Sequence, residues 1–373
     1  MFRHPLAKLL LLGQLVLVSW MAQAAPPVEV EDVMGRKVSL SLPASRIVLG
    51  FYPEDYLAVA GEGGAERLVG MSLGWFMKSR PAIWSLYVAS QPQLAKVPDL
   101  GNVQDQSFSI EKTLAVKPDL VILAKWQYEA LAADLPRLEQ AGIPVVVIDY
   151  NAQTLTQHMA STLLLGKLTG QEARARKMAD EYKAKIDTIT SRIAAAKRTP
   201  PRVYIELGDK GPAEYSYTYG KDMWGAMALL AGGDNVAAPF VDRWGPIHPE
   251  QLLASKPEVI LMAGYESVSS AVAMQVGQDV SAKTVRQRLQ GFAARPGWRE
   301  LPAVKQGRLY AVYHGATRSI MDAALIEFMA KALYPDLFQD LAPLATYQAF
   351  YQHYLPIRPQ GTFMLGIKQD DAS

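Results

Sequence analysis

Residues 109–123 read SIEKTLAVKPDLVIL, and residues 248–262 read HPEQLLASKPEVILM. Each phrase predicts a short helix, a turn at Lys-Pro and a buried strand, in that order. The two copies lie too far apart for a solenoid, whose repeats span about 20–50 residues. The sequence therefore predicts one helix-turn-strand unit in each of two similar lobes. Five identical pairs relate the copies: Glu111 and Glu250, Leu114 and Leu253, Ala115 and Ala254, Lys117 and Lys256, Pro118 and Pro257.

The sequence around the two phrases predicts an α/β protein. Short apolar strands alternate with segments of helical spacing, which is typical of mainly parallel sheets covered by helices. An alternating segment around Met34-Gly35 predicts a hairpin before the first lobe. The strands are predicted at residues 46–50, 67–71, 120–124 and 145–150, and again at 202–207, 258–262 and 308–313.

A long helix is predicted between the lobes. Thr169 and Glu172 have capping-box spacing, which places Thr169 at the N-cap. A helix from there to the residues before Pro200 is on the order of 40 Å long, enough to connect two lobes. A coiled-coil dimer is the alternative, but the heptads are few and both ends run into globular sequence. The apolar stripe consists of Ala175, Ala179, Tyr182, Ile186, Ile189, Ile193 and Ala196.

Residues 1–24 have the pattern of a secretory signal peptide. Arg3 and Lys8 precede an apolar run, and Ala22-Gln23-Ala24 forms a small-residue cleavage signal. An uncleaved anchor is the alternative, but the run is shorter than the roughly 20 residues of a spanning helix. We expect cleavage near Ala24 and export. Four further regions follow: an amino-terminal lobe (25–152), a connector with the long helix (153–200), a carboxyl-terminal lobe (201–345) and a terminal region (346–373).

Composition excludes several classes of protein. The formal charge of +2 falls to zero without Arg3 and Lys8, so nothing indicates a nucleic-acid partner. The chain has no cysteine, which excludes disulfides, thiolate metal sites and a lipid-modified cysteine tether. An exported protein without a tether needs a closed compartment, and we expect the periplasm, with no membrane anchor.

With these features assembled, the chain resembles the periplasmic binding proteins that serve ABC importers for iron-siderophores, haem and vitamin B12. The resemblance extends from about Val28 to about Tyr334, and five segments in the same order carry it. It implies two Rossmann-like lobes joined by one backbone helix, with a ligand cleft between the lobes. The segments are residues 30–48, 109–123, 248–261, 229–237 and 304–312.

The resemblance also implies a partner. In that family an exposed Glu on each lobe docks onto arginine pockets of the two permease subunits, which work with an ATPase. By position these residues are Glu111 and Glu250, and Arg binds carboxylates through paired, charge-assisted hydrogen bonds. A Glu in the first turn of a helix can instead simply complement the helix dipole. We expect a monomer that delivers its ligand to the permease.

Residues that follow the predicted strands are the candidates for ligand binding, because ligands meet parallel sheets at the carboxyl ends of the strands. These positions are rich in aromatic and cationic side chains, which suit a large anionic ligand such as a ferric siderophore. Individual roles stay open: tyrosines can pack, Arg243 and Arg318 can pair with acids, and His314 can simply form a hydrogen bond. The candidates are Tyr52, Trp75, Lys125, Trp126, Tyr150, Tyr217, Tyr219, Arg243, Trp244, Tyr265, His314 and Arg318.

Direct metal coordination by the protein is not expected. Relatives that bind iron directly carry a His seven residues before the docking Glu, where this chain has Arg243. The tyrosine that ligates haem in haem-binding relatives would fall in residues 70–81, which contain Trp75 and Phe76 but no Tyr. The sequence thus favours a preassembled Fe(III) chelate, with no covalent cofactor. Haem, cobalamin and a nickel chelate are the alternatives within the family.

Two other classes of function receive less support. The sequence contains no phosphate-binding loop, no nucleophile elbow and no zinc-protease motif, so we expect no catalytic residues. A periplasmic enzyme and a partner of a chemosensor remain as alternatives. At the end of the chain, Tyr347, Phe350, Tyr351 and Tyr354 have helical spacing. This pattern predicts a last amphipathic helix docked on a lobe, followed by a disordered acidic end.

Overall fold

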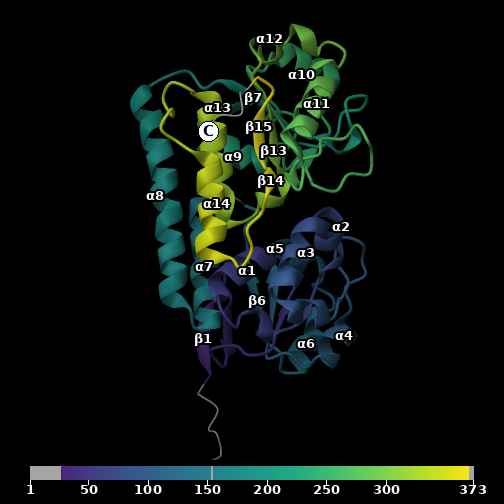
Figure 1. The fold of residues 1–373 in the computed structure, drawn as a ribbon. Coiled ribbons are helices and arrows are strands. Elements are labelled where there is room, and N and C mark those ends of the chain that lie inside the picture. Colours follow the sequence, from purple (N-terminus) through teal and green to yellow (C-terminus); the bar gives the residue numbers. More distant parts are fainter. Residues whose placement is uncertain (1–26, 153, 369–373) are drawn as a thin grey trace, which may run out of the picture.

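A computed structural model describes residues 27–152 and 154–368. The predicted signal peptide, its cleavage point at Ala24 and the acidic end at 369–373 lie outside the described residues. Two lobes are stacked one above the other, and a long helix, α8, runs along one side of both (Figure 1). Within the described ranges, no helix combines the length and apolar character needed to cross a membrane.

The amino-terminal lobe is built on a fully parallel sheet with strand order β4-β3-β5-β6. The predicted hairpin precedes it as the antiparallel pair β1 (Val28–Glu31) and β2 (Lys37–Leu40). All five residues of the central strand β5 are buried, as expected for a sheet covered on both faces. The strands are β3 (Ile47–Leu49), β4 (Leu68–Met71), β5 (Leu120–Ala124) and β6 (Val145–Ile148), and the helices are α1 (Pro53–Ala60), α2 (Gly74–Ser79), α3 (Pro81–Ser90), α4 (Ile110–Ala115), α5 (Lys125–Ala130) and α6 (Leu135–Gln140).

The carboxyl-terminal lobe has a mixed sheet with order β10-β8-β7-β11-β13-β15, and β9 also pairs with β7. Its centre is parallel, whereas β8, β10 and β15 run antiparallel at the edges. The two-lobe α/β prediction is therefore confirmed. The strands are β7 (Arg202–Leu207), β8 (Thr218–Tyr219), β9 (Asp234–Asn235), β10 (Trp244–Gly245), β11 (Val259–Gly264), β12 (Gly277–Gln278), β13 (Leu309–Tyr313), β14 (Gly361–Thr362) and β15 (Met364–Gly366), and the helices are α9 (Trp224–Leu230), α10 (Pro249–Ser255), α11 (Ala282–Ala293), α12 (Pro302–Gln306) and α13 (Ala323–Leu333).

The repeated phrase forms the same junction in both lobes. Lys117 and Lys256 both adopt left-handed backbone conformations, with φ of 47° and 48°, between the end of the helix and the proline. An arginine at or just before the start of a neighbouring strand secures each turn. The Nε of Arg46 donates to the Lys117 carbonyl at 2.9 Å, and the Nε of Arg202 donates to the Lys256 carbonyl at 3.1 Å. The two lobes are therefore alike in contacts as well as in sequence.

The connector contains two helices where the capping pattern indicated one. Helix α7 (Leu155–Thr169) ends at Gly170, whose φ of 70° is typical of a helix carboxyl-terminal cap. The prediction that Thr169 caps the long helix is wrong, because its hydroxyl donates to the Leu165 carbonyl at 2.7 Å at the end of α7. Helix α8 (Glu172–Ala196) begins after Gln171 and packs against α7.

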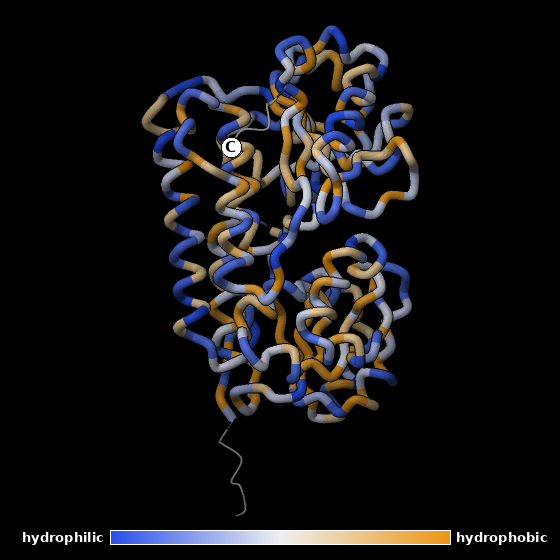
Figure 2. The backbone as a smooth tube through the Cα atoms, viewed as in Figure 1, coloured by the Kyte–Doolittle hydropathy of each residue, from blue (hydrophilic) through white to orange (hydrophobic). Residues whose placement is uncertain are grey.

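The apolar stripe of α8 is covered by the protein itself. Ala175, Tyr182, Ile186 and Ile189 are buried, and α8 packs on α7 and α13. Hydrophilic and hydrophobic residues alternate along α8, while hydrophobic segments gather inside both lobes (Figure 2). The stripe therefore holds the connector to the lobes, as predicted, and is not available to form a coiled-coil dimer.

The carboxyl-terminal region is more ordered than the sequence predicted. Helix α14 (Pro343–Tyr354) forms as expected and packs on α13, but it also contacts α1 of the other lobe. The sequence predicted no strand after this helix, but Gly361–Thr362 form β14 and Met364–Gly366 form β15. Strand β15 pairs with β13 and extends the sheet. Strands of two and three residues are too short to show the alternation by which strands are recognised.

The Glu206→Gln variant should unfold at a lower urea concentration, because it leaves a buried arginine of the carboxyl-terminal lobe without its charge partner. Arg295 donates to both oxygens of Glu206 on β7, at 2.8 and 2.9 Å, and both side chains are buried. Removing one charge of a buried pair leaves the other uncompensated, so we expect a loss of about 3 kcal/mol in urea unfolding. The control is Asp340→Asn, which breaks the exposed bidentate pair with Arg192. Its midpoint should stay unchanged, and equal losses would contradict the prediction.

Candidate functional site

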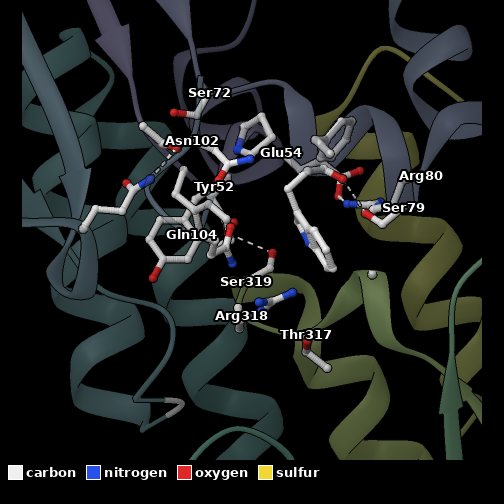
Figure 3. Close-up of a pocket in the computed structure, with 18 of the residues that line it drawn as sticks. Tyr52, Glu54, Ser72, Ser79, Arg80, Asn102, Gln104, Thr317, Arg318 and Ser319 are labelled. Carbon is white, nitrogen blue, oxygen red and sulfur yellow. Dashed lines mark hydrogen bonds and ion pairs between the residues drawn. The ribbon is translucent and has the colours of Figure 1, made fainter. Parts of the chain in front are cut away.

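A pocket lies where the two lobes meet and encloses about 670 Å³ of empty space, part of it open to solvent. In Figure 3, Thr317, Arg318 and Ser319 of the carboxyl-terminal lobe face Tyr52, Asn102 and Gln104 of the other lobe. The lining consists of residues 50–55, Ser72, Trp75, Phe76, Ser79, Arg80, Asn102, Gln104 and Gln127 from the amino-terminal lobe, and Tyr265, Gly315 and residues 317–319 from the carboxyl-terminal lobe.

The pocket lies at the carboxyl ends of the parallel strands, where the sequence placed it. Its walls follow β3, β4 and β5 in one lobe and β11 and β13 in the other. Two non-glycine residues in the lining, Tyr52 (φ 59°) and Arg318 (φ 58°), have left-handed backbones. Strain of this kind persists only where surrounding contacts enforce it, and it often gathers at binding sites.

Four of the twelve predicted ligand residues line the pocket: Tyr52, Trp75, Tyr265 and Arg318. The Tyr52 hydroxyl donates to the Asn151 side chain at 2.9 Å, which fixes its ring in the wall. The rings of Trp75 and Tyr265 meet edge to face across the lobes, with centroids 6.2 Å apart. The pocket therefore has an aromatic wall from both lobes and a guanidinium group at Arg318.

Three predicted residues of the amino-terminal lobe stand behind the lining. Tyr150 is fully buried and packs edge to face against Tyr52 at 5.1 Å. Trp126 packs against Phe51, which does line the pocket, at 5.4 Å. Lys125 is half-buried at the start of α5, outside the lining. Tyr150 and Trp126 thus support the wall in this structure, and none of the three residues lines the pocket.

Tyr219 and His314 also lie behind the lining, in the carboxyl-terminal lobe. The His314 ring packs against Tyr265 at 5.0 Å and lies 5.9 Å from the Tyr219 ring, and both side chains are buried. The Nδ1 of His314 accepts the indole N–H of Trp224 at 2.9 Å, which requires this nitrogen to be unprotonated. Burial, aided by the charge of Arg318, holds the pKa of His314 well below its ordinary value. His314 is thus a neutral packing residue.

The remaining three candidates lie away from the pocket, on an exposed edge of the carboxyl-terminal sheet. Tyr217 and Trp244 are about half exposed and belong to the β8–β10 region. Arg243 pairs with Asp222 at 3.0 Å and stacks on Trp244. The alternative that Arg243 pairs with a nearby acid is the one that the structure shows.

Two acidic residues in the lining, Glu54 and Asp55, were not among the predicted ligand residues. Asp55 on α1 accepts hydrogen bonds from the Ser319 hydroxyl at 2.8 Å and the Ile320 amide at 2.9 Å, so it joins the two lobes. Burial raises the pKa of Asp55 to about 7, although the two hydrogen bonds oppose the shift. Sequence position gave no signal for this role, because the partners of Asp55 lie far along the chain.

Glu54 forms a buried ion pair with Arg80, which lies between α2 and α3. Burial disfavours the charged form of Arg80, but Glu54 and the neighbouring tyrosines outweigh it and keep the pKa above its ordinary value. Arg80 and Ser72 line the same pocket, and two of their atoms, Arg80 Nη2 and Ser72 Oγ, are buried without a hydrogen-bond partner among the described residues. Buried polar atoms are normally satisfied, so both are candidate contacts for a ligand.

The side-chain geometry tests neither the prediction about metal coordination nor the prediction that Glu111 and Glu250 dock onto a permease. Across residues 27–152 and 154–368, no group of three or more His, Asp or Glu side chains is placed to hold a metal ion. Glu111 and Glu250 are both exposed, in the first turns of α4 and α10. Glu111 pairs with Arg137 at 2.7 Å. In Figure 1, α4 and α10 lie on separate lobes, on the side away from α8.

Comparison with known proteins decides the family. A model for a family described as periplasmic binding protein matches residues 82–313. The chain belongs to the periplasmic binding protein family. The structure of the TroA-like periplasmic binding protein FepB from Veillonella parvula agrees, with a TM-score of 0.86 and 30% identity over 91% of this chain and 99% of that one.

Relatives of this periplasmic binding protein differ in what they bind. The uncharacterized ABC transporter substrate-binding lipoprotein YvrC of Bacillus subtilis is 24% identical over 84% of this chain and 88% of its own length. The vitamin B12-binding protein of Yersinia pestis is 27% identical over 43% of this chain, and the match spans 55% of that relative. A periplasmic haem-binding protein from Pseudomonas aeruginosa shares the fold, with a TM-score of 0.54 and 20% identity over 79% of this chain and 94% of that one.

The predicted membership is thus confirmed. The chain is a binding protein of the ABC importer type and not an enzyme, and its relatives imply a permease partner.

Asp55 should make the stability of this periplasmic binding protein depend on pH. Its folded pKa of about 7 exceeds the ordinary value of 3.8, so the folded state binds the proton more tightly. This contribution to stability is complete below pH 3.8 and is lost as pH rises through about 7. We expect the free energy of unfolding of wild type, relative to Asp55→Asn, to fall across this window. Guanidinium unfolding from pH 4 to 8 measures it, and parallel curves for the two proteins would refute the prediction.

Proposed function

We propose that this periplasmic binding protein captures a ferric siderophore in the pocket between its lobes and delivers it to an ABC permease. The observation that carries the proposal is the combination of aromatic rings with two guanidinium groups in one pocket. Phe51, Trp75 and Tyr265 offer ring surface, while Arg80 and Arg318 offer donors. Ferric siderophores present apolar or aromatic surface and metal-bound oxygens, which such side chains recognise.

The polar lining supports the same class of ligand. Ser72 Oγ and Arg80 Nη2 form no hydrogen bond with any described residue. The guanidinium group of Arg318 stacks on the ring of Phe51, with its central carbon 5.5 Å from the ring centroid. A chelate brings oxygen atoms that accept hydrogen bonds from such donors. In this proposal the siderophore supplies all the ligands of the iron, and the protein binds the outer surface of the complex.

Vitamin B12 is the second candidate, favoured by the similarity to the Yersinia pestis protein over 163 residues. The match spans about half of that relative, so it reaches only part of the site's two-lobe lining. Haem and a nickel chelate were the other ligands that the sequence analysis left open, and they are tested in the same binding experiment.

Tryptophan fluorescence should identify the ligand, because Trp75 lies in the pocket wall. Ferric catecholates, hydroxamates and carboxylates, haem, cobalamin and nickel chelates are titrated separately. We expect saturable quenching by one class of ferric siderophore.

Two variants locate the quenching. The Trp75→Phe variant should lose much of the quenching. The Trp244→Phe variant should retain it, because Trp244 is exposed and lies outside the pocket. Saturation by cobalamin alone would replace the proposed ligand, and no response from any compound would refute the proposal.

Transport should depend on the two exposed glutamates. We expect Glu111→Lys combined with Glu250→Lys to abolish ligand uptake in cells, because charge reversal repels the arginines that the resemblance places on the permease. Ligand affinity in vitro should remain within about twofold of wild type, since neither residue lines the pocket.

The matched control for transport changes the same total charge elsewhere. Asp180→Lys combined with Asp187→Lys alters two exposed acids on α8, on the other side of the molecule. Uptake should persist in this variant. If both double variants transport equally well, the docking role of Glu111 and Glu250 is wrong.

A further inference from the structure

The carboxyl-terminal helix α14 reaches the wall of the ligand pocket. Figure 1 shows α14 running alongside α8 past the level at which the lobes meet. Its Tyr351 is fully buried and donates to Glu54 Oε1 at 2.7 Å. Arg174 of α8 donates to the carbonyl of Tyr354 at 2.9 Å, and β15 anchors the segment that follows on β13. A segment beyond the matched residues 82–313 thus contacts a lining residue.

Tyr351 helps to orient the Glu54 carboxylate. Oε1 of Glu54 accepts hydrogen bonds from Tyr351 and, at 3.0 Å, from Tyr87. Oε2 pairs with Nη1 of Arg80. Because Glu54 is only 4% exposed, water does not compete for these bonds. The two hydroxyl groups that donate to Oε1 therefore fix the orientation of the carboxylate. This orientation sets the position of Oε2 beside Arg80.

Arg80 is held on two of its three nitrogens, and the third is free. Nε donates to the Tyr313 hydroxyl at 2.7 Å, and Nη1 pairs with Glu54. Nη2 is buried without a partner among the described residues. Arg295, the other strongly buried arginine described above, donates from all three nitrogens.

The pocket leaves space for the Arg80 head group. A Cβ added at Gly315 would lie 2.5 Å from the Tyr313 hydroxyl and 2.7 Å from Arg80 Nε, so the absence of a side chain there leaves room for both hydrogen-bonded groups. Leaving a buried donor unpaired is costly, and the cost is removed when a ligand oxygen accepts the bond. Ser72 Oγ offers a second unpaired polar atom in the same lining.

We propose that Tyr351 is a positioning residue for ligand recognition: through Glu54 it holds Arg80 so that Nη2 binds a negatively charged oxygen of the chelate. The inference rests on the proposed function, because it requires an anionic chelate in this pocket. It gives the terminal helix, for which the sequence indicated only packing, a part in selecting ligands by charge. Removing the Tyr351 hydroxyl should loosen the Arg80 head group without removing any side chain that touches the ligand.

The test compares two single-oxygen deletions on one helix in the full-length protein. Tyr351→Phe removes the bond to Glu54, and Tyr354→Phe removes a bond of equal length, 2.7 Å, to Glu181 of α8, away from the pocket. Tryptophan quenching measures the affinity for a ferric tricatecholate, which is anionic, and for an uncharged ferric trihydroxamate. Thermal unfolding measures the structural effect of each change.

Tyr351→Phe should weaken binding of the tricatecholate about tenfold, the size expected for one hydrogen bond to a charged group. Its affinity for the trihydroxamate should change less than about twofold, and Tyr354→Phe should change neither. Equal affinities for the tricatecholate in the two variants would overturn the inference while leaving the proposed function standing.

A measurement without ligand separates the two proposals. In protein labelled with ¹⁵N-arginine, the Arg80 Nε–H signal is identified by its loss in Arg80→Lys. Tyr351→Phe should shift this signal, and Tyr354→Phe should leave it in place. If wild type binds neither chelate, the proposed function fails, and an unshifted Arg80 signal in Tyr351→Phe would then overturn the positioning role as well.

Discussion

Charged side chains that are buried where the two lobes meet must find their partners within the protein, because water does not reach them. Asp55 meets this requirement by accepting from the opposite lobe. Glu266 accepts from the amides of Ala82 and Ile83 at the start of α3, at 2.8 and 3.0 Å, and so joins the lobes a second time. Moving one lobe away would leave these carboxylates unpaired. The shape of the pocket therefore depends on contacts that also hold the lobes together.

The sequence predicted the architecture well because the information for it is local. The repeated phrase combines a helix, a turn and a strand within fifteen residues, and its Lys-Pro turn adopts the same left-handed conformation in both lobes. The bonds from Arg46 and Arg202 that secure the turns were not predicted, since both residues lie more than fifty positions away along the chain. The extra helix α7 was missed because Thr169 fits the pattern of a helix start as well as that of a helix end.

The candidate site was predicted less completely, for a physical reason. Position after a strand indicates which edge of the sheet a residue occupies, but not how deep its side chain lies. Tyr52 and Tyr265 line the pocket, whereas Tyr150 and His314, from equivalent positions, stand one layer behind. Buried acids such as Glu54 are harder still to predict as site residues, because their burial depends on hydrogen-bond donors from distant segments of the chain. Sequence position alone therefore favoured aromatic residues and passed over the acids.

The last strand of the chain has a consequence for how this protein is made. Strand β15 covers the outer edge of β13, and it is contributed by residues 364–366, about fifty residues after β13. Until those residues have been synthesised, β13 presents an unpaired edge, the kind of surface on which chains associate with one another. The carboxyl-terminal lobe can therefore complete its sheet only after residues 364–366 have been synthesised, later than all the other strands of that sheet. Folding of this lobe during synthesis leaves the edge of β13 exposed over that interval.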